Sequence, residues 1–260
     1  MAGSGVFDLT GRVALVTGAS EGGLGFWSAR ALAVQGAAVA VSDVGSLDSL
    51  DSVRKAAGAV GLSALAHPAD LTDPEQVDEL VAAVVREFGR IDILVNHSGI
   101  NLRKPALETS LEEWHKVLDV NLTAAFMLDR AVGAHMVAQG SGSIINTSSI
   151  YTDIVGPLPE LAYYASKAGV ANLTRGLASE WGPSGVRVNC VAPGVFYPTR
   201  MTAALGSDPG RLEQMAGRTL LGRLGEPESD LAGTIVWLAS DASAYVTGQV
   251  IYVDGGWTAG

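Results

Sequence analysis

The sequence predicts an α/β fold in which helices cover both faces of a doubly wound parallel sheet. Two observations predict this fold. Short continuous apolar runs alternate with helical stretches, and polar or glycine-rich clusters follow the ends of those runs. Strands buried on both faces read as continuous apolar runs, and such sheets bind ligands at the carboxyl ends of their strands. Because 260 residues fit one large domain and no linker, repeat or low-complexity segment interrupts them, we expect residues 1–260 to form a single domain.

Composition restricts the class of protein. Hydrophobic residues make up 48% of the chain and the net charge is −10, so a globular protein is expected and an anionic partner such as nucleic acid or a membrane surface is disfavoured. One cysteine, Cys190, excludes an internal disulfide and a cysteine-rich metal site. No signal-peptide pattern and no apolar run near the roughly 20 residues of a membrane span is present. We therefore expect a cytoplasmic protein.

The first predicted strand, residues 12–17, runs into a glycine-rich turn over residues 18–25, and a helical stretch follows to Gly36. Glycines between a strand and a helix let backbone N–H groups approach a pyrophosphate, with the positive helix end behind them. A tight strand-to-helix turn alone has the same composition. The glycines therefore indicate a phosphate site only together with other signals.

Asp43 provides such a signal, because it ends the second predicted strand, residues 38–42. A carboxylate at this place accepts hydrogen bonds from both hydroxyls of an adenosine ribose and repels a 2′-phosphate. Between Thr17 and Asp43 the only basic residue is Arg30, inside the helix, and Glu21 adds negative charge to the turn. The sequence therefore predicts NAD as the cofactor, in preference to NADP.

The middle of the chain continues the alternation. Residues 62–66 form a third apolar stretch that leads to Asp70. The clearest helix follows, because Thr72 or Asp73 can cap it, Pro74 suits its first turn, and one face carries an apolar stripe of Val77, Leu80, Val81, Val84, Val85 and Phe88. Residues 91–96 form the next strand, and the helix after it carries Asn121 beside an apolar stripe.

The strand at residues 143–147 delivers Ser148 and Ser149, and the next helix carries Tyr163 and Lys167. Residues four apart on a helix share one face. A phenol is a poor base near its usual pKa of about 10, and a nearby cation favours the phenolate. The pair is therefore able to move a proton to or from an alcohol oxygen, which a serine hydroxyl would hold. Taken alone, Tyr-x-x-x-Lys is most often an ordinary helix.

Several ordered motifs together resemble the short-chain dehydrogenase/reductase family. They are Thr17 and Gly18 with the following glycines, residues 96–99, Asn121, Ser149, Tyr163 with Lys167, and Pro193 with Gly194. The similarity covers nearly the whole chain, down to residues 253–257. It implies a Rossmann-type fold, hydride transfer between NAD and a secondary alcohol or ketone, and a homotetramer.

The resemblance also implies roles for individual residues. Tyr163 would be the acid/base, Lys167 would lower its pKa and hold the nicotinamide ribose, and Ser149 would orient the substrate oxygen. Asn121 would support a proton relay through water. The cofactor would contact Gly18, Ser20, Gly23, Leu24 and Gly25 in the turn, Asp43, Asp70, Leu71, Asn96, Ser98 and Gly99 around the adenosine, and Pro193, Gly194, Val195 and Thr199 around the nicotinamide.

The chain departs from the family pattern in four places. Four residues rather than three separate Gly18 from Gly23, and Ser149 lies one residue farther from Tyr163 than usual. Thr199 also comes one residue late. His97 and Ser98 replace the usual Asn and Ala, and we interpret His97 as a packing variant. Tyr164, three residues before Lys167, shares its face as well, but the family spacing selects Tyr163.

The substrate is indicated by fewer residues. Arg103, just past the fourth strand, would suit a carboxylate through a bidentate contact, although a solvated loop is the more common explanation of such a cation. Tyr151 and Phe196 could line the same pocket, and residues 195–225 are expected to form a lid over it. Residues 101–105, residues 135–140 and the Gly-Gly-Trp ending at 255–257 are similar to sugar and sugar-acid dehydrogenases of the family, which favours a sugar, polyol or sugar acid. The histidines His67, His115 and His135 have no metal-ligand spacing, so no metal is expected.

Three other functions remain open. A reductase of 3-oxoacyl thioesters or bulky apolar ketones would use the same residues, although the acidic composition does not favour docking of an acidic carrier protein. A non-catalytic dinucleotide sensor could have the same fold, since fold does not fix function. A serine hydrolase acting through Ser149 would lack the Gly-x-Ser-x-Gly elbow and would leave the glycine-rich turn unexplained.

Overall fold

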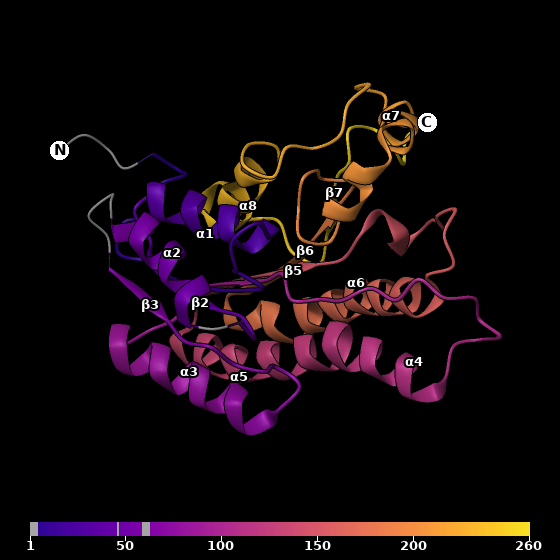
Figure 1. The fold of residues 1–260 in the computed structure, drawn as a ribbon. Coiled ribbons are helices and arrows are strands. Elements are labelled where there is room, and N and C mark those ends of the chain that lie inside the picture. Colours follow the sequence, from indigo (N-terminus) through magenta and orange to yellow (C-terminus); the bar gives the residue numbers. More distant parts are fainter. Residues whose placement is uncertain (1–4, 46, 59–62) are drawn as a thin grey trace.

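In the part of the chain that the structure describes, the strands form one seven-stranded parallel sheet. Figure 1 shows this sheet at the centre of the fold, between helices. The structure is a computed structural model that describes residues 5–45, 47–58 and 63–260. The strands are β1 (Val13–Thr17), β2 (Ala38–Ser42), β3 (Ala64–Ala66), β4 (Ile93–Asn96), β5 (Gly142–Thr147), β6 (Val186–Pro193) and β7 (Val250–Val253). Their order is β3-β2-β1-β4-β5-β6-β7, which confirms the doubly wound Rossmann-type sheet.

Helices cover both faces of this sheet. The α-helices are α1 (Leu24–Val34), α2 (Leu47–Gly58), α3 (Pro74–Phe88), α4 (Leu111–Leu118), α5 (Ala124–Gln139), α6 (Leu161–Trp181), α7 (Pro209–Ala216) and α8 (Ala232–Ala239). Short turns of other helix types are η1 (Asp119–Thr123), η2 (Ile150–Thr152), η3 (Gly182–Ser184), η4 (Ala203–Ser207) and η5 (Asp241–Ser243). Figure 1 shows α1, α2 and α8 on one side and α3, α5 and α6 on the other.

The core has two halves, one on each face of the sheet. Alternate strand residues such as Val16 and Val39 pack with α1 and α8, while Leu15 and Leu94 pack with α3, α5 and α6. Strands β1 and β4 are buried along their whole length, as their continuous apolar sequences predict. The chain order reverses between these two strands, so the sheet places its ligand crevice at their carboxyl ends.

The observed elements agree with the predicted ones at some ends and differ at others. The helix predicted after Asp73 is α3, which begins at Pro74 with the Asp73 side chain as its cap. Strand β4 begins two residues later than predicted, because the Asp92 carboxylate accepts the backbone N–H of Val13. Of the stretch predicted at 62–66, Leu62 lies outside the described residues and β3 covers the rest from Ala64. The prediction did not include α2, α7, α8 or β7.

An ionisable side chain, Asp129, lies inside the core. Asp129 on α5 is fully buried, and its Oδ2 accepts a hydrogen bond of 2.8 Å from Asn146 Nδ2 on β5. The second oxygen of Asp129 and the Oδ1 atom of Asn146 have no hydrogen-bond partner in the described part of the chain. Burial raises the pKa of Asp129 to about 7, and the bond from Asn146 offsets part of that effect.

Candidate active site

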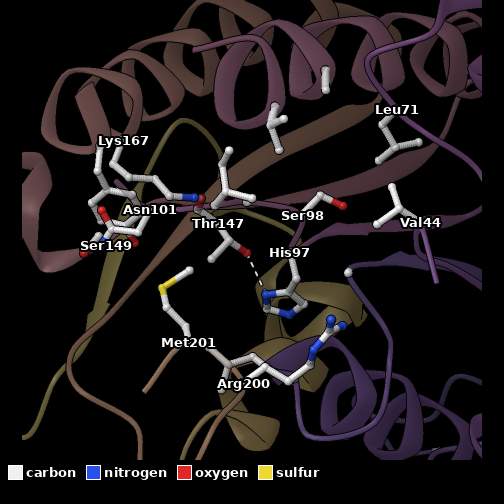
Figure 2. Close-up of a pocket in the computed structure, with 18 of the residues that line it drawn as sticks. Val44, Leu71, His97, Ser98, Asn101, Thr147, Ser149, Lys167, Arg200 and Met201 are labelled. Atoms are coloured by element: carbon white, nitrogen blue, oxygen red, sulfur yellow. Dashed lines mark hydrogen bonds between the residues drawn. The ribbon is translucent and has the colours of Figure 1, made fainter. Parts of the chain in front are cut away.

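A cleft of about 1640 Å³ lies at the carboxyl edge of the sheet, between the strand ends and the segment 195–225. Figure 2 shows side chains reaching into it from several strands and from the segment after β6. The predicted residues that line this cleft are Gly18, Gly23, Leu24, Asp43, Asp70, Leu71, Ser98, Gly99, Arg103, Ser149, Tyr163, Lys167, Pro193, Gly194, Phe196 and Thr199. The topology therefore gathers residues from positions 18 to 199 in one place.

The glycine-rich turn lies at the start of α1, where no side chain caps the helix. The first N–H groups of α1 are therefore available to an anion. Gly18 and Gly22 have positive φ angles of 63° and 80°, and a Cβ on Gly25 would lie 2.4 Å from the Gly18 oxygen. Only glycine fits at Gly25, because the helix start packs directly on the turn. Gly25 thus shapes the turn without lining the cleft.

Asp43 follows β2 beside this turn. One of its oxygens accepts the backbone N–H of Ser20 at 3.0 Å, and the other accepts the N–H of Val44 at 2.8 Å. The guanidinium of Arg200, from the segment after β6, lies 3.7 Å from the first oxygen. The backbone N–H of Arg200 also donates to the Gly22 oxygen at 2.9 Å. The sequence argument found no cation near Asp43, because Arg200 lies far away along the chain.

His97 takes part in a network of polar contacts along the wall of the cleft. Its Nε2 lies 2.8 Å from Ser28 Oγ on α1, and its Nδ1 lies 2.8 Å from Thr147 Oγ1 on β5, the contact drawn as a dashed line in Figure 2. Burial and, second, the charge of Lys167 lower the pKa of His97 to about 3, so the ring is neutral. We interpreted His97 as a packing variant because the sequence showed no partner for a functional histidine; the structure provides two such partners, on elements distant in sequence.

Tyr163 and Lys167 lie together on one face of α6, as their spacing predicts. The ammonium of Lys167 lies 5.6 Å from the centre of the Tyr163 ring and donates to the Thr147 carbonyl at 2.8 Å. Burial lowers the pKa of Lys167 to about 8. Burial also raises the pKa of Tyr163 to about 12, and the Ser149 hydroxyl offsets part of this effect. The expected lowering of the phenol pKa by Lys167 is thus not seen in this geometry, because desolvation is the larger effect.

The neighbouring Tyr164 does not compete for this place. Its hydroxyl donates to the Leu158 carbonyl at 2.6 Å, on the side of the loop before α6. Tyr163 lines the cleft and Tyr164 does not. The structure therefore places the phenol of Tyr163, selected by spacing, beside Ser149.

Asn121 lies behind the wall of the cleft, in the π-helical turn η1. Its Oδ1 accepts the N–H of Ile100 at 2.8 Å, and its Nδ2 donates to the Ile100 oxygen at 2.9 Å and to Ser166 Oγ at 3.0 Å. A Cβ on Gly99 would lie 3.3 Å from Asn121 Oδ1 and 3.4 Å from Lys167 Nζ. Asn121 therefore holds the loop after β4 against α6.

Other predicted residues also lie outside the lining. Asn96 is buried and accepts a hydrogen bond of 3.0 Å from Thr17 Oγ1, which ties β4 to β1. Tyr151 packs edge-on against Tyr163 and Tyr164, and Val195 packs with a small apolar cluster behind the cleft. The residues predicted to contact ligand that do not line the cleft are Ser20, Gly25, Asn96, Asn121, Tyr151 and Val195.

Arg103 lies at the mouth of the cleft near Tyr163. Its Nε donates to Glu160 Oε1 at 2.7 Å, and the Glu160 side chain is only 2% exposed whereas that of Arg103 is 41% exposed. The buried carboxylate fixes the guanidinium through one nitrogen. In contrast, Lys104 pairs with Glu113 and does not line the cleft.

Comparison with known proteins identifies relatives over the full length of the chain. The family model described as enoyl-(acyl carrier protein) reductase matches residues 18–258. Gluconate 5-dehydrogenase of Gluconobacter oxydans is 41% identical over 253 residues, 97% of each chain, and a 3-oxoacyl-[acyl-carrier-protein] reductase of Synechocystis is 42% identical over 249 residues, 95% of this chain and 97% of that one. The crystal structure of a gluconate 5-dehydrogenase from Burkholderia cenocepacia in complex with NADP and tartrate has a TM-score of 0.92 at 35% identity and covers 99% of both chains.

Proposed function

The chain belongs to the short-chain dehydrogenase/reductase family and is an oxidoreductase that acts on CH–OH groups with a nicotinamide dinucleotide; on that premise we propose that Tyr163 is its acid/base and that its substrate is a sugar acid. The observation that carries the proposal is the grouping of Tyr163, Ser149 and Lys167 at one end of the cleft, with Arg103 at its mouth. A complete set of these residues supports an enzyme over a non-catalytic dinucleotide sensor.

The residues of the cleft fit a dinucleotide. The uncapped start of α1 and the positive φ angles of Gly18 and Gly22 leave room and N–H groups for a pyrophosphate, and a side chain at Gly99 would crowd Lys167. The turn with Leu24, the strand ends with Asp43, Asp70, Leu71 and Ser98, and the β6 end with Pro193, Gly194 and Thr199 would hold it. When bound, it exchanges a hydride with the substrate carbon.

The protein supplies the proton and the positioning. Tyr163 would accept the proton of the substrate hydroxyl during oxidation and return it during reduction, while Ser149 would hold the same oxygen. Because the pKa of Tyr163 is raised to about 12, the phenolate needs a stabilising cation when it forms. Lys167, whose ammonium lies 5.6 Å from the centre of the Tyr163 ring and donates to the Thr147 carbonyl, is a candidate for that cation. Asn121 would act as a positioning residue that fixes the loop carrying Gly99.

Arg103 supports a substrate that carries a carboxylate. The buried Glu160 accepts the hydrogen bond from Arg103 Nε, and this ion pair holds the guanidinium in place. The two terminal nitrogens, whose geometry matches a carboxylate, are not used by this bond. The resemblance to gluconate 5-dehydrogenase supports the same class. A 3-oxoacyl thioester or apolar ketone remains the second candidate, since Phe196 and Met201 line the cleft and a 3-oxoacyl reductase is equally similar.

Matched substrates test this proposal. D-Gluconate and D-glucitol have the same length and differ at one end, where a carboxylate replaces a hydroxymethyl group. We expect Arg103→Gln to lower kcat/KM for gluconate about tenfold or more and to leave that for glucitol within about twofold, since a charge-assisted contact is lost only from the acid. The control Lys104→Gln removes a neighbouring cation outside the cleft. Equal losses for both substrates would refute the carboxylate role.

Two further expectations stand as proposals. NAD was predicted because no cation was found near Asp43, but Arg200 lies beside it and the Burkholderia relative was crystallised with NADP. We therefore propose that NADP is accepted as well as NAD. A homotetramer is proposed from the family resemblance; exposed apolar side chains on α4 and α5, at Leu111, Phe126 and Val137, agree with a subunit interface there. Light scattering of the purified protein measures that state.

A further inference from the structure

Arg200 lies at the adenosine end of the cleft, although it belongs to the segment proposed as the substrate lid. Its backbone N–H donates to the carbonyl of Gly22, and its guanidinium lies 3.7 Å from Asp43 Oδ2. In Figure 2, Arg200 and Met201 enter the cleft side by side from this segment. One side chain of the lid therefore faces the carboxylate that would receive the adenosine ribose.

Asp43 does not depend on the guanidinium for its hydrogen bonds. Both oxygens of Asp43 already accept backbone N–H groups, from Ser20 and Val44. At 3.7 Å the contact is an ion pair without a hydrogen bond, and the side chain of Arg200 is 62% exposed. Within residues 5–45, 47–58 and 63–260, the guanidinium makes no hydrogen bond, so its fork of donors is available to a ligand.

A phosphate is the ligand whose chemistry this arrangement fits. A guanidinium binds phosphate through two parallel charge-assisted hydrogen bonds, whereas a ribose hydroxyl is neutral and has a single oxygen. The hydroxyl of Ser20, whose N–H binds Asp43, is buried and has no partner in the described residues. A 2′-phosphate on the adenosine ribose would approach this corner, where Asp43 alone would repel it and Arg200 offsets the repulsion.

We propose that Arg200 is the ligand of the 2′-phosphate of NADP, so that the lid sets the cofactor specificity of the chain. The inference rests on the proposed function, namely use of a nicotinamide dinucleotide in this cleft. The backbone bond to Gly22 holds the residue in place whatever its side chain. A substitution at position 200 therefore removes the guanidinium and leaves the path of the chain unchanged.

Binding of two small nucleotides tests the proposal without turnover. Adenosine 2′,5′-bisphosphate carries the 2′-phosphate and adenosine 5′-monophosphate lacks it, and calorimetric titration gives the Kd of each for the full chain. In Arg200→Gln we expect the Kd of the bisphosphate to rise about tenfold or more and that of the monophosphate to stay within about twofold. Arg200→Lys, which retains a point charge, should recover part of the loss.

The control is Arg211→Gln, on α7 of the same segment, because Arg211 does not line the cleft and should change neither Kd. Parallel weakening of both nucleotides in Arg200→Gln, or no change in either, would overturn the assignment while leaving the proposed function intact. Failure of the unmodified protein to bind NAD, NADP and both nucleotides would instead refute the proposed function, and the assignment with it.

Discussion

The buried Asp129 should make the stability of this protein fall as the pH rises. Its pKa is about 7 in the folded state against 3.8 when exposed. Between these values the folded state keeps a proton that the unfolded state has lost, so the free energy of unfolding decreases with increasing pH until about pH 7. That proton would also satisfy the two oxygens without partners, because a protonated Asp129 donates to Asn146 Oδ1 while accepting from Asn146 Nδ2.

Asp129→Asn tests this reasoning, since an amide can make the same two hydrogen bonds and carries no titrating proton. The pKa of Asp129 differs by roughly three units between the exposed and the folded state, and about two of these units, from pH 5 to about pH 7, lie within the range from pH 5 to 8. Two units correspond to about 3 kcal/mol of unfolding free energy. For a domain of this size that is roughly 6–12 °C in Tm. The Tm of the variant relative to the unmodified protein should therefore increase by this amount from pH 5 to pH 8.

Thermal unfolding followed by circular dichroism at pH 5, 6, 7 and 8 measures the difference. Taking the difference at each pH cancels the contribution of other buried groups whose pKa values are shifted, notably His97 and Lys167. Asp119→Asn, an exposed carboxylate at the start of η1, is the control and should give a constant difference. A difference for Asp129→Asn that stays constant from pH 5 to 8 would refute the protonated carboxyl.

Two other predictions concern the cleft. Tyr163→Phe should lower kcat about 10²- to 10⁴-fold by removing the acid/base while NAD still binds, measured by steady-state kinetics and by titration; comparable turnover would reject the mechanism. Burial lowers the pKa of His97 to about 3 in the folded state. Below about pH 6.5 the unfolded state therefore binds a proton at this histidine and the folded state does not, so the free energy of unfolding decreases as the pH falls. His97→Asn should therefore show a shallower loss of Tm between pH 6.5 and 4.5; identical slopes would contradict this account.

Local signals predicted much of the fold and the placement of Tyr163 beside Lys167. The apolar runs of β1 and β5, the cap and stripe of α3, and the i,i+4 spacing of Tyr163 and Lys167 depend on neighbours in the chain, and the structure has them as expected. Strand β7 was not predicted, because Val250–Val253 is a short run and no helix follows it to continue the alternation of strands and helices.

Contacts between distant segments were the part that sequence could not provide. The partners of His97 come from α1 and β5, and Arg200 reaches Asp43 from 157 positions away, so no spacing rule relates them. The pKa of Tyr163 was expected to fall because a cation lies nearby, yet burial raises it. Desolvation depends on how much of the fold surrounds a group, which composition and periodicity do not report.

The bond between the Gly22 carbonyl and the Arg200 N–H has a consequence for engineering. Gly22 lies in the stretch where this turn has one residue more than the family usually has, and Arg200 follows Thr199, which is also displaced by one. The two insertions meet through this bond. If residues 195–225 are exchanged for those of a relative in order to change the substrate, residues 18–25 should be exchanged with them. Otherwise the backbone bond between the turn and the lid would be lost.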